Sequence, residues 1–233
     1  MISEYIESIG VELEGGMKYS TFKNLQKKFK KWNLDSNLAS SFDVSIKRDF
    51  SWPAEHSANE LKFWSDKLID IKHFLDWAYT FGDVKTNYSC GFHLHVKFKN
   101  HVNSVYLWTK QVTINKFHSA YIEHYKNNQK YMARLHNRYC KKNTLNNRRL
   151  LEYYVYGNGE RYYSVNLIST TKHAEIKLKD GVMTKYPGTL EFRLFPYQTD
   201  SKEAYDTIKW FVKTVDEIMK SYAERDFWIQ IFW

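Results

Sequence analysis

Three short segments of this chain alternate apolar and polar residues, and this pattern restricts the fold more than any other feature of the sequence. They are Gly10–Glu14, Cys90–Val96 and Thr189–Arg193. Successive side chains of a β-strand point to opposite faces, so each segment would place its polar residues on one face and its apolar residues on the other. The pattern predicts strands of a sheet with one buried face and one polar face. The polar positions are Glu12, Glu14, His93, His95, Glu191 and Arg193.

Helical and strand-like segments fill the rest of the chain. Apolar residues recur at helical spacing in 22–32, 68–78 and 208–222, and the last run follows Asp200 and Glu203 at capping-box spacing. We therefore predict an α+β protein, with a mostly antiparallel sheet of about six strands, helices on one face and an open polar face. Its 233 residues fit one domain, predicted over 1–233. Further short strands are predicted at 40–45, 59–63, 161–168 and 173–179. The first strand is predicted to end at Gly15-Gly16, one helix is predicted from 103 or 104 to about 125, and Asp-Gly predicts a turn at 180–181.

Charge and composition limit the classes of partner. The formal net charge of +9 favours a polyanion, which includes nucleic acid, an acidic polymer and the triphosphate of ATP. Many basic residues fall in 134–149, where a solvated helix face is the ordinary alternative. Hydrophobic residues make up 43% of the chain, enough for a substantial core.

The cysteine count and the termini bear on the compartment. Two cysteines are too few for a disulfide framework. Glu4 and Glu7 stand where a signal peptide would be basic, and no apolar run approaches the roughly 20 residues that span a membrane. We expect a cytoplasmic protein without a membrane segment. The apolar Phe227–Trp233 predicts a final strand or a docking segment, such as a homo-oligomer contact.

Each polar motif has an ordinary explanation when it is taken alone. Glu-x-Glu is frequent on solvated strands, a His-x-His pair is often simply hydrogen-bonded, and neighbouring Glu and Arg residues commonly pair on a wet sheet face. Together they offer carboxylate oxygens, imidazoles and a guanidinium. This set of groups can hold a divalent metal and phosphate on one face of a sheet.

In combination the motifs resemble the amidoligase family, ATP-dependent carboxylate–amine ligases related to glutamine synthetase and glutamate–cysteine ligase. The resemblance implies a fold like the glutamine synthetase catalytic domain, with the site on the concave face of its sheet. It also implies ATP and Mg²⁺ as cofactors, with Mn²⁺ as the alternative because histidine is a less typical magnesium ligand. The similar segments follow in order at 10–14, 43–45, 59–62, 90–95, 161–166 and 189–195.

The resemblance assigns two metal positions. Glu12, His93 and Glu191 would bind the ion beside the transferred phosphate. Glu14 and Glu60 would bind the second ion.

Other residues would contact the nucleotide and the substrate. His95 would face a nucleotide phosphate, and Arg193 would hold a carboxylate or the acyl phosphate. Arg161 and Asn166 would touch the nucleotide or substrate, or else pair with a neighbouring acidic residue and a turn. Asp43 is either part of the site or a local hydrogen-bonding cap. The predicted catalytic residues are thus Arg193, Glu191 and His95.

The predicted activity is ATP-dependent joining of a carboxylate substrate to an amine substrate through an acyl phosphate. Neither substrate is identified, and either one could belong to a peptide or a polyanionic polymer. The segment 126–159 matches no acceptor-binding segment, and the family's glycine before Thr199 is missing. One alternative is a non-catalytic nucleic-acid-binding or structural protein that retains the fold. Another is a metal-dependent hydrolase or nuclease.

Overall fold

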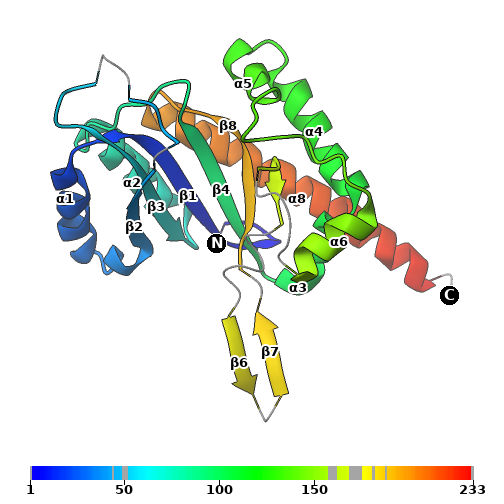
Figure 1. Ribbon diagram of the computed structural model, residues 1–233. Helices are drawn as coiled ribbons and strands as arrows, with labels where there is room; N and C mark the ends of the chain where they lie inside the picture. The colour runs from blue at the N-terminus through cyan, green and yellow to red at the C-terminus, as the bar shows by residue number, and fades with distance from the viewer. Residues whose placement is uncertain are drawn as a thin grey trace. The chain divides into compact units, whose positions relative to one another are not determined.

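A computed structural model of the chain describes residues 2–43, 45–48, 52–156, 162–167, 175–179, 182–186 and 188–231. Six strands form one sheet in the order β2-β3-β1-β4-β8-β5 (Figure 1). The pairs β2–β3, β3–β1 and β5–β8 are antiparallel, so the predicted α+β class and strand number are confirmed. The strands are β1 (Ile6–Met17), β2 (Leu38–Phe42), β3 (Ser57–Ser65), β4 (Gly91–Phe98), β5 (Val165–Asn166) and β8 (Leu190–Pro196).

Helices alternate with these strands, and a separate hairpin pairs β6 (Glu175–Lys179) with β7 (Val182–Tyr186). The strand β7 was not predicted, and the predicted turn at 180–181 lies outside the described residues. The helices are α1 (Tyr19–Lys30), α2 (Leu68–Thr80), α3 (His101–Trp108), α4 (Gln111–Tyr125), α5 (Gln129–Arg134), α6 (Asn147–Tyr156) and α8 (Ser201–Ile231), with a short 3₁₀ turn at Asp35–Asn37.

The chain forms two compact units. Unit 1 comprises Met1–Ile2, Ser8–His95 and Leu194–Lys209, and unit 2 comprises Ser3–Glu7, Val96–Arg193 and Trp210–Trp233. The prediction of one catalytic domain over 1–233 stays a prediction.

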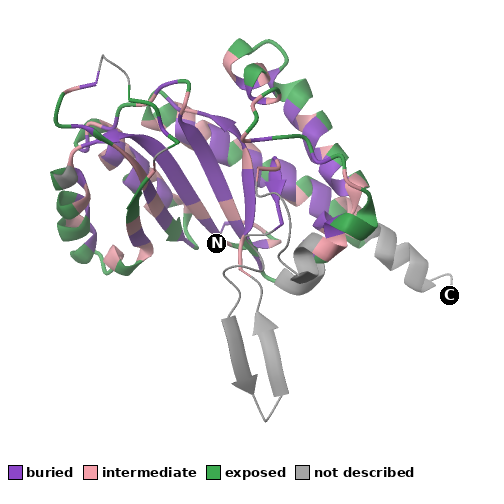
Figure 2. Cartoon of the chain, viewed as in Figure 1, coloured by how far each residue is buried: buried purple, intermediate pink, exposed green. Residues whose placement is uncertain are grey.

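Unit 1 packs α1 and α2 against the apolar face of β3. The Phe29 ring of α1 lies 5.1 Å from the Phe63 ring of β3, and Phe74 of α2 stacks on Phe63 at 5.0 Å. Val11 and Leu13 of β1 are buried as well. The buried strands contrast with the exposed outer side of α1 (Figure 2). The alternation in β1 therefore buries its apolar residues, as predicted.

The strand β1 continues through Gly15 and Gly16, where the sequence predicted its end. A Cβ atom added to Gly16 would lie 2.3 Å from the Trp52 ring, and one added to Gly15 would lie 2.7 Å from the Lys85 carbonyl oxygen. Gly16 also exchanges two backbone hydrogen bonds with Lys85, of 2.7 and 2.9 Å. The strand therefore continues through these glycines, and the absence of side chains allows Trp52 and Lys85 to approach it closely. The glycines do not mark a turn.

Unit 2 is built around aromatic rings. Phe192 of β8 contacts Trp108, Phe117 and Phe211, from α3, α4 and α8, with ring centroids 4.9, 5.0 and 4.8 Å away. One helix was predicted where α3 and α4 stand. The structure has two helices instead. The Gln111 N–H at the start of α4 donates to the Asn147 side chain at 2.7 Å, and this hydrogen bond caps α4 as a separate helix.

The last helix, α8, begins where the sequence predicted but extends further than predicted. Its predicted start is confirmed, because the Glu203 N–H donates to Asp200 at 2.8 Å and the Glu203 carboxylate accepts the Thr199 N–H at 2.8 Å. The predicted final strand is wrong, since α8 continues to Ile231 and includes most of that apolar segment. None of the helices in the described part of the chain is long and apolar enough to cross a membrane.

Candidate functional site

The register between β1 and β3 gathers four polar side chains on the face of unit 1 opposite the helices. Glu12 lies across from Lys62, and Glu14 lies across from Glu60. Directly opposed residues of an antiparallel pair share a face. The predicted polar face is therefore present, and Lys62 belongs to it.

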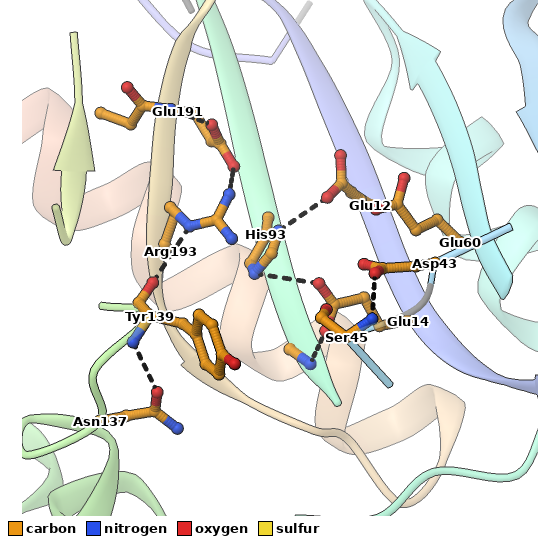
Figure 3. A network of polar contacts seen from close by, with 12 residues as sticks. Glu12, Glu14, Asp43, Ser45, Glu60, His93, Asn137, Tyr139, Glu191 and Arg193 are labelled. Atoms are coloured by element: carbon orange, nitrogen blue, oxygen red, sulfur yellow. Dashed lines mark hydrogen bonds and ion pairs between the residues drawn. The ribbon is translucent and has the colours of Figure 1, made fainter. Parts of the chain in front are cut away.

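Glu12 lies beside three nitrogen-bearing side chains. Its Oε1 lies 2.8 Å from His93 Nδ1 (Figure 3). Its Oε2 lies 3.0 Å from Lys62 Nζ and 3.4 Å from His95 Nε2. Glu12 is 6% exposed and His93 is 1% exposed. These side chains enclose one another, so this part of the polar face is buried where the sequence predicted an open one.

These contacts fix the charge of Glu12. Burial opposes its ionisation, but the hydrogen bond with His93 and the nearby His95 ring outweigh that cost and hold the pKa of Glu12 well below its usual range. Burial likewise opposes the charge of Lys62, yet Glu12 and Glu60 raise the pKa of the lysine above its usual value. The centre therefore holds an ionised carboxylate and an ammonium group side by side.

Glu14 is held by the strand that carries the histidines. The Gly91 N–H donates to Glu14 Oε2, and His93 Nε2 lies 3.6 Å from Glu14 Oε1. His93 thus stands between Glu12 and Glu14. Cys90 has a packing role, because it is buried in a small cluster with Ile46 and Trp52.

A second acidic group adjoins the first. Asp43 follows β2 and accepts the Ser45 N–H at 2.7 Å, while Ser41 donates to Glu60 Oε2 at 3.0 Å. Burial and the nearby Glu12 charge raise the pKa of Glu60. Asp43 therefore is both a local cap and a member of the polar cluster, the two alternatives that the sequence left open.

Two sets of three side chains within the described residues of unit 1 bring ligand atoms within 4.8 Å of one another. The first set is Glu12, Glu14 and His93, and the second is Glu14, Asp43 and Glu60. Glu14 belongs to both. Carboxylate oxygens with one imidazole nitrogen suit Mg²⁺ or Mn²⁺ better than a metal that prefers sulfur. The donor chemistry of unit 1 thus fits two neighbouring divalent cations.

Unit 2 carries the other predicted polar pair. Arg193 Nη1 donates to Glu191 Oε1, and Asn166 Nδ2 donates to Glu191 Oε2 at 2.6 Å. Arg193 Nε also donates to the Tyr139 carbonyl oxygen at 3.3 Å (Figure 3). Asn166 therefore binds Glu191 from the paired strand β5. Arg161 lies outside the described residues.

The basic segment 134–149 has both buried and exposed arginines, and the buried Arg134 contacts β8. Arg134 is 5% exposed, and its Nε donates to the Arg193 carbonyl oxygen at 3.3 Å. Arg148, by contrast, is exposed and pairs with Glu152 at 3.0 Å. At least one arginine of this segment is thus structural and unsuited to binding nucleic acid.

Sequence reasoning missed two contributors to the unit 1 cluster. The two-residue period of a strand places Lys62 on the same face as Glu60. An ordinary solvated strand shows the same pattern, so the sequence alone did not identify Lys62 as part of the cluster. The hydrogen bond from the Gly91 N–H to Glu14 could not be predicted, because a pattern of side chains does not show where a backbone donor points. The predicted addition of Glu191 to the ligands of Glu12 and His93 stays a prediction.

Comparison with known proteins agrees with the motif pattern. The sequence model of a family described as putative amidoligase enzyme matches residues 61–215, which is more than half of the chain. No curated protein and no solved structure matches the chain. Glu12, Glu14, Asp43 and Glu60 precede the matched segment, whereas His93 and His95 lie inside it.

Proposed function

Since the chain belongs to the amidoligase enzyme family, a ligase-type family, we propose that it is an ATP-dependent carboxylate–amine ligase. The observation that carries this proposal is the pair of three-ligand groups that share Glu14. Amide formation from a carboxylate needs a better leaving group than oxide, and ATP supplies one as an acyl phosphate. That step brings several anionic oxygens together, which the site must neutralise.

In the proposed reaction a substrate carboxylate oxygen attacks the γ-phosphorus of ATP. The bond from this phosphorus to the β–γ bridging oxygen breaks and ADP leaves. The amine nitrogen then attacks the acyl carbon, inorganic phosphate leaves, and the nitrogen loses a proton. The products are an amide, ADP and phosphate.

Divalent Mg²⁺ or Mn²⁺ would be held by Glu12, Glu14 and His93 and by Glu14, Asp43 and Glu60. When bound, the ions would supply positive charge to phosphate oxygens. The chain's own contribution is orientation: the Gly91 N–H and His93 fix Glu14, and Glu12 fixes the His93 ring.

Two further residues keep their predicted roles in this proposal. His95, at 3.4 Å from Glu12, would face a nucleotide phosphate. Arg193 would hold the substrate carboxylate, because Glu191 and the Tyr139 carbonyl group fix the plane of its guanidinium. The ligand role of Glu191, the glutamine synthetase-like fold, the cytoplasmic location and any homo-oligomer stay predictions.

Calorimetric titration with ATP and Mg²⁺ tests the proposal. Binding should be lost in Glu12→Ala and in His93→Ala, and it should persist in Glu7→Ala, a change on the same strand at an exposed ion pair with Lys97. Each variant is first checked for folding by circular dichroism. ADP release on addition of candidate acids and amines then identifies the substrates.

Three results would contradict the proposal. The first is ATP binding that survives both site substitutions. The second is salt-sensitive binding of RNA or DNA that survives them while ATP does not bind, which would favour the nucleic-acid alternative. The third is metal-dependent hydrolysis that needs no ATP.

A further inference from the structure

The strand β2 lies at one end of the strand order and has an exposed outer edge in the described part of the chain. The Asp43 N–H donates to the Ala58 carbonyl of β3 at 3.3 Å, continuing the register of the β2–β3 pair. Because the ladder of an antiparallel pair has a two-residue period, the N–H and C=O groups of Ser40 and Phe42 point away from β3. Such an edge is a template for another extended chain.

A pocket of about 380 Å³ opens between this strand and α1. Phe22 of α1 and Phe42 of β2 give it an apolar part, and Phe42 is 66% exposed. Gln26 and Asn59 add amide groups. The pocket thus suits an apolar side chain, and its amide groups suit the backbone of the same bound chain.

The charged residues that line the pocket are basic. Among the described residues its lining includes Lys18 and Lys23 and no carboxylate. Lys18 pairs with Glu55 at 2.8 Å, but α1 itself contains four lysines and no acidic residue. This helix would attract an acidic segment and repel a basic one.

The pocket and the second cation group lie on opposite faces at the same end of the β2–β3 pair. Phe42 and Asn59 of the pocket alternate with Asp43 and Glu60 along these strands, and Ser41 donates to Glu60 at 3.0 Å. An extended chain paired with β2 would place alternate side chains on each face, so that one enters the pocket and its neighbours lie on the face of the carboxylates.

We propose that the β2 edge and this pocket bind an acidic peptide segment, added to the sheet as a further strand. The inference rests on the proposed ligase function in one respect: the peptide would carry the substrate carboxylate. Backbone pairing with Ser40 and Phe42 would supply affinity. The pocket would take one side chain, and Lys18 and Lys23 of its lining would attract acidic side chains two positions away on the same face of the added strand.

The test measures fluorescence anisotropy of a labelled peptide of about ten residues, at about 0.15 M salt. One central valine has glutamates two positions away on either side, so that these side chains share one strand face, and threonines fill the alternate positions. ATP and metal are left out, so the result does not depend on the ligase activity. Two matched peptides are compared: one has lysine in place of glutamate, and the other has alternate amides N-methylated.

Three protein variants separate the contributions. Ser40→Pro removes an outward N–H without taking a ladder bond from β3, and it should weaken binding about tenfold. Lys23→Glu should weaken binding about tenfold by reversing charge at the pocket. Lys30→Glu is the control on the same helix outside the pocket lining, and it should change binding much less.

The inference is supported if the glutamate peptide binds at least tenfold tighter than both matched peptides and both site variants weaken it. Equal binding of the lysine peptide, or binding that ignores N-methylation, would overturn it. A dimer in solution that forms through the β2 edge and excludes the peptide would also overturn it. If Ser40→Pro unfolds the chain, the N-methylated peptide and Lys23→Glu still decide the outcome.

Discussion

Replacing Glu12 with glutamine removes one negative charge and changes little else in size. In the native protein this carboxylate lies 2.8 Å from His93 Nδ1, 3.0 Å from Lys62 Nζ and 3.4 Å from His95 Nε2. A glutamine would turn an NH₂ group towards at least one of these donors. We expect Glu12→Gln to destabilise the fold even in the absence of any ligand.

The size of the effect follows from burial. Breaking a buried ion pair by removing one partner costs about 3–5 kcal/mol. The Lys62 side chain is 39% exposed and keeps Glu60 at 2.7 Å, which favours the lower end, about 3 kcal/mol. For a chain of this length that corresponds to a fall of roughly 6–12 °C in Tm.

Thermal and denaturant unfolding at neutral pH measure the change, with Glu7→Gln as the control on the same strand. The pKa of Glu12 is lowered in the folded state, so its stabilisation is present above the ordinary glutamate range and is lost as pH falls through the lowered pKa. The difference between wild type and variant should shrink over that acidic range. A Tm shift no larger than that of Glu7→Gln would refute this reasoning.

Three further predictions concern the scaffold. Gly16→Ala should cost about 1–3 kcal/mol in denaturant unfolding, because the new Cβ would meet the buried Trp52 ring at 2.3 Å; an unchanged midpoint would contradict the close packing. Asp200→Ala should cost about 1 kcal/mol through loss of its 2.8 Å bond from the Glu203 N–H, with Asp200→Asn nearer to wild type. Burial and Lys142 lower the pKa of His118 to about 4, so the unfolded state takes up a proton first and stability should fall by about 3 kcal/mol as pH drops from about 6.5 to 4. His118→Gln should flatten that decline, and an equal decline in the variant would exclude His118 as its source.

Local periodicity predicted the residues of the polar face but not their partners. Glu12 and Glu14 share a face because strand side chains alternate, and this is a property of neighbouring residues alone. The partner of Glu14 is the Gly91 backbone, 77 positions away, and no local pattern identifies it. Lys62 was visible as a neighbour of Glu60, but only the register shows it opposite Glu12.

The incorrect boundaries have similar causes. Gly15 and Gly16 look like a turn in sequence, yet the structure uses them where Trp52 and Lys85 approach the strand. The apolar alternation after Phe227 looks like a strand, whereas α8 continues through it. In each case the sequence pattern fits two structures, and more distant residues or the preceding helix determine which one forms.

Binding of Mn²⁺, followed by electron paramagnetic resonance in the presence of ATP, tests the cation cluster most directly. The Glu14 carboxylate belongs to both three-ligand groups. The account predicts two bound ions per wild-type chain, weakened binding of both in Glu14→Gln, and no change in Glu7→Gln. Unchanged stoichiometry and affinity in a folded Glu14→Gln protein would contradict it.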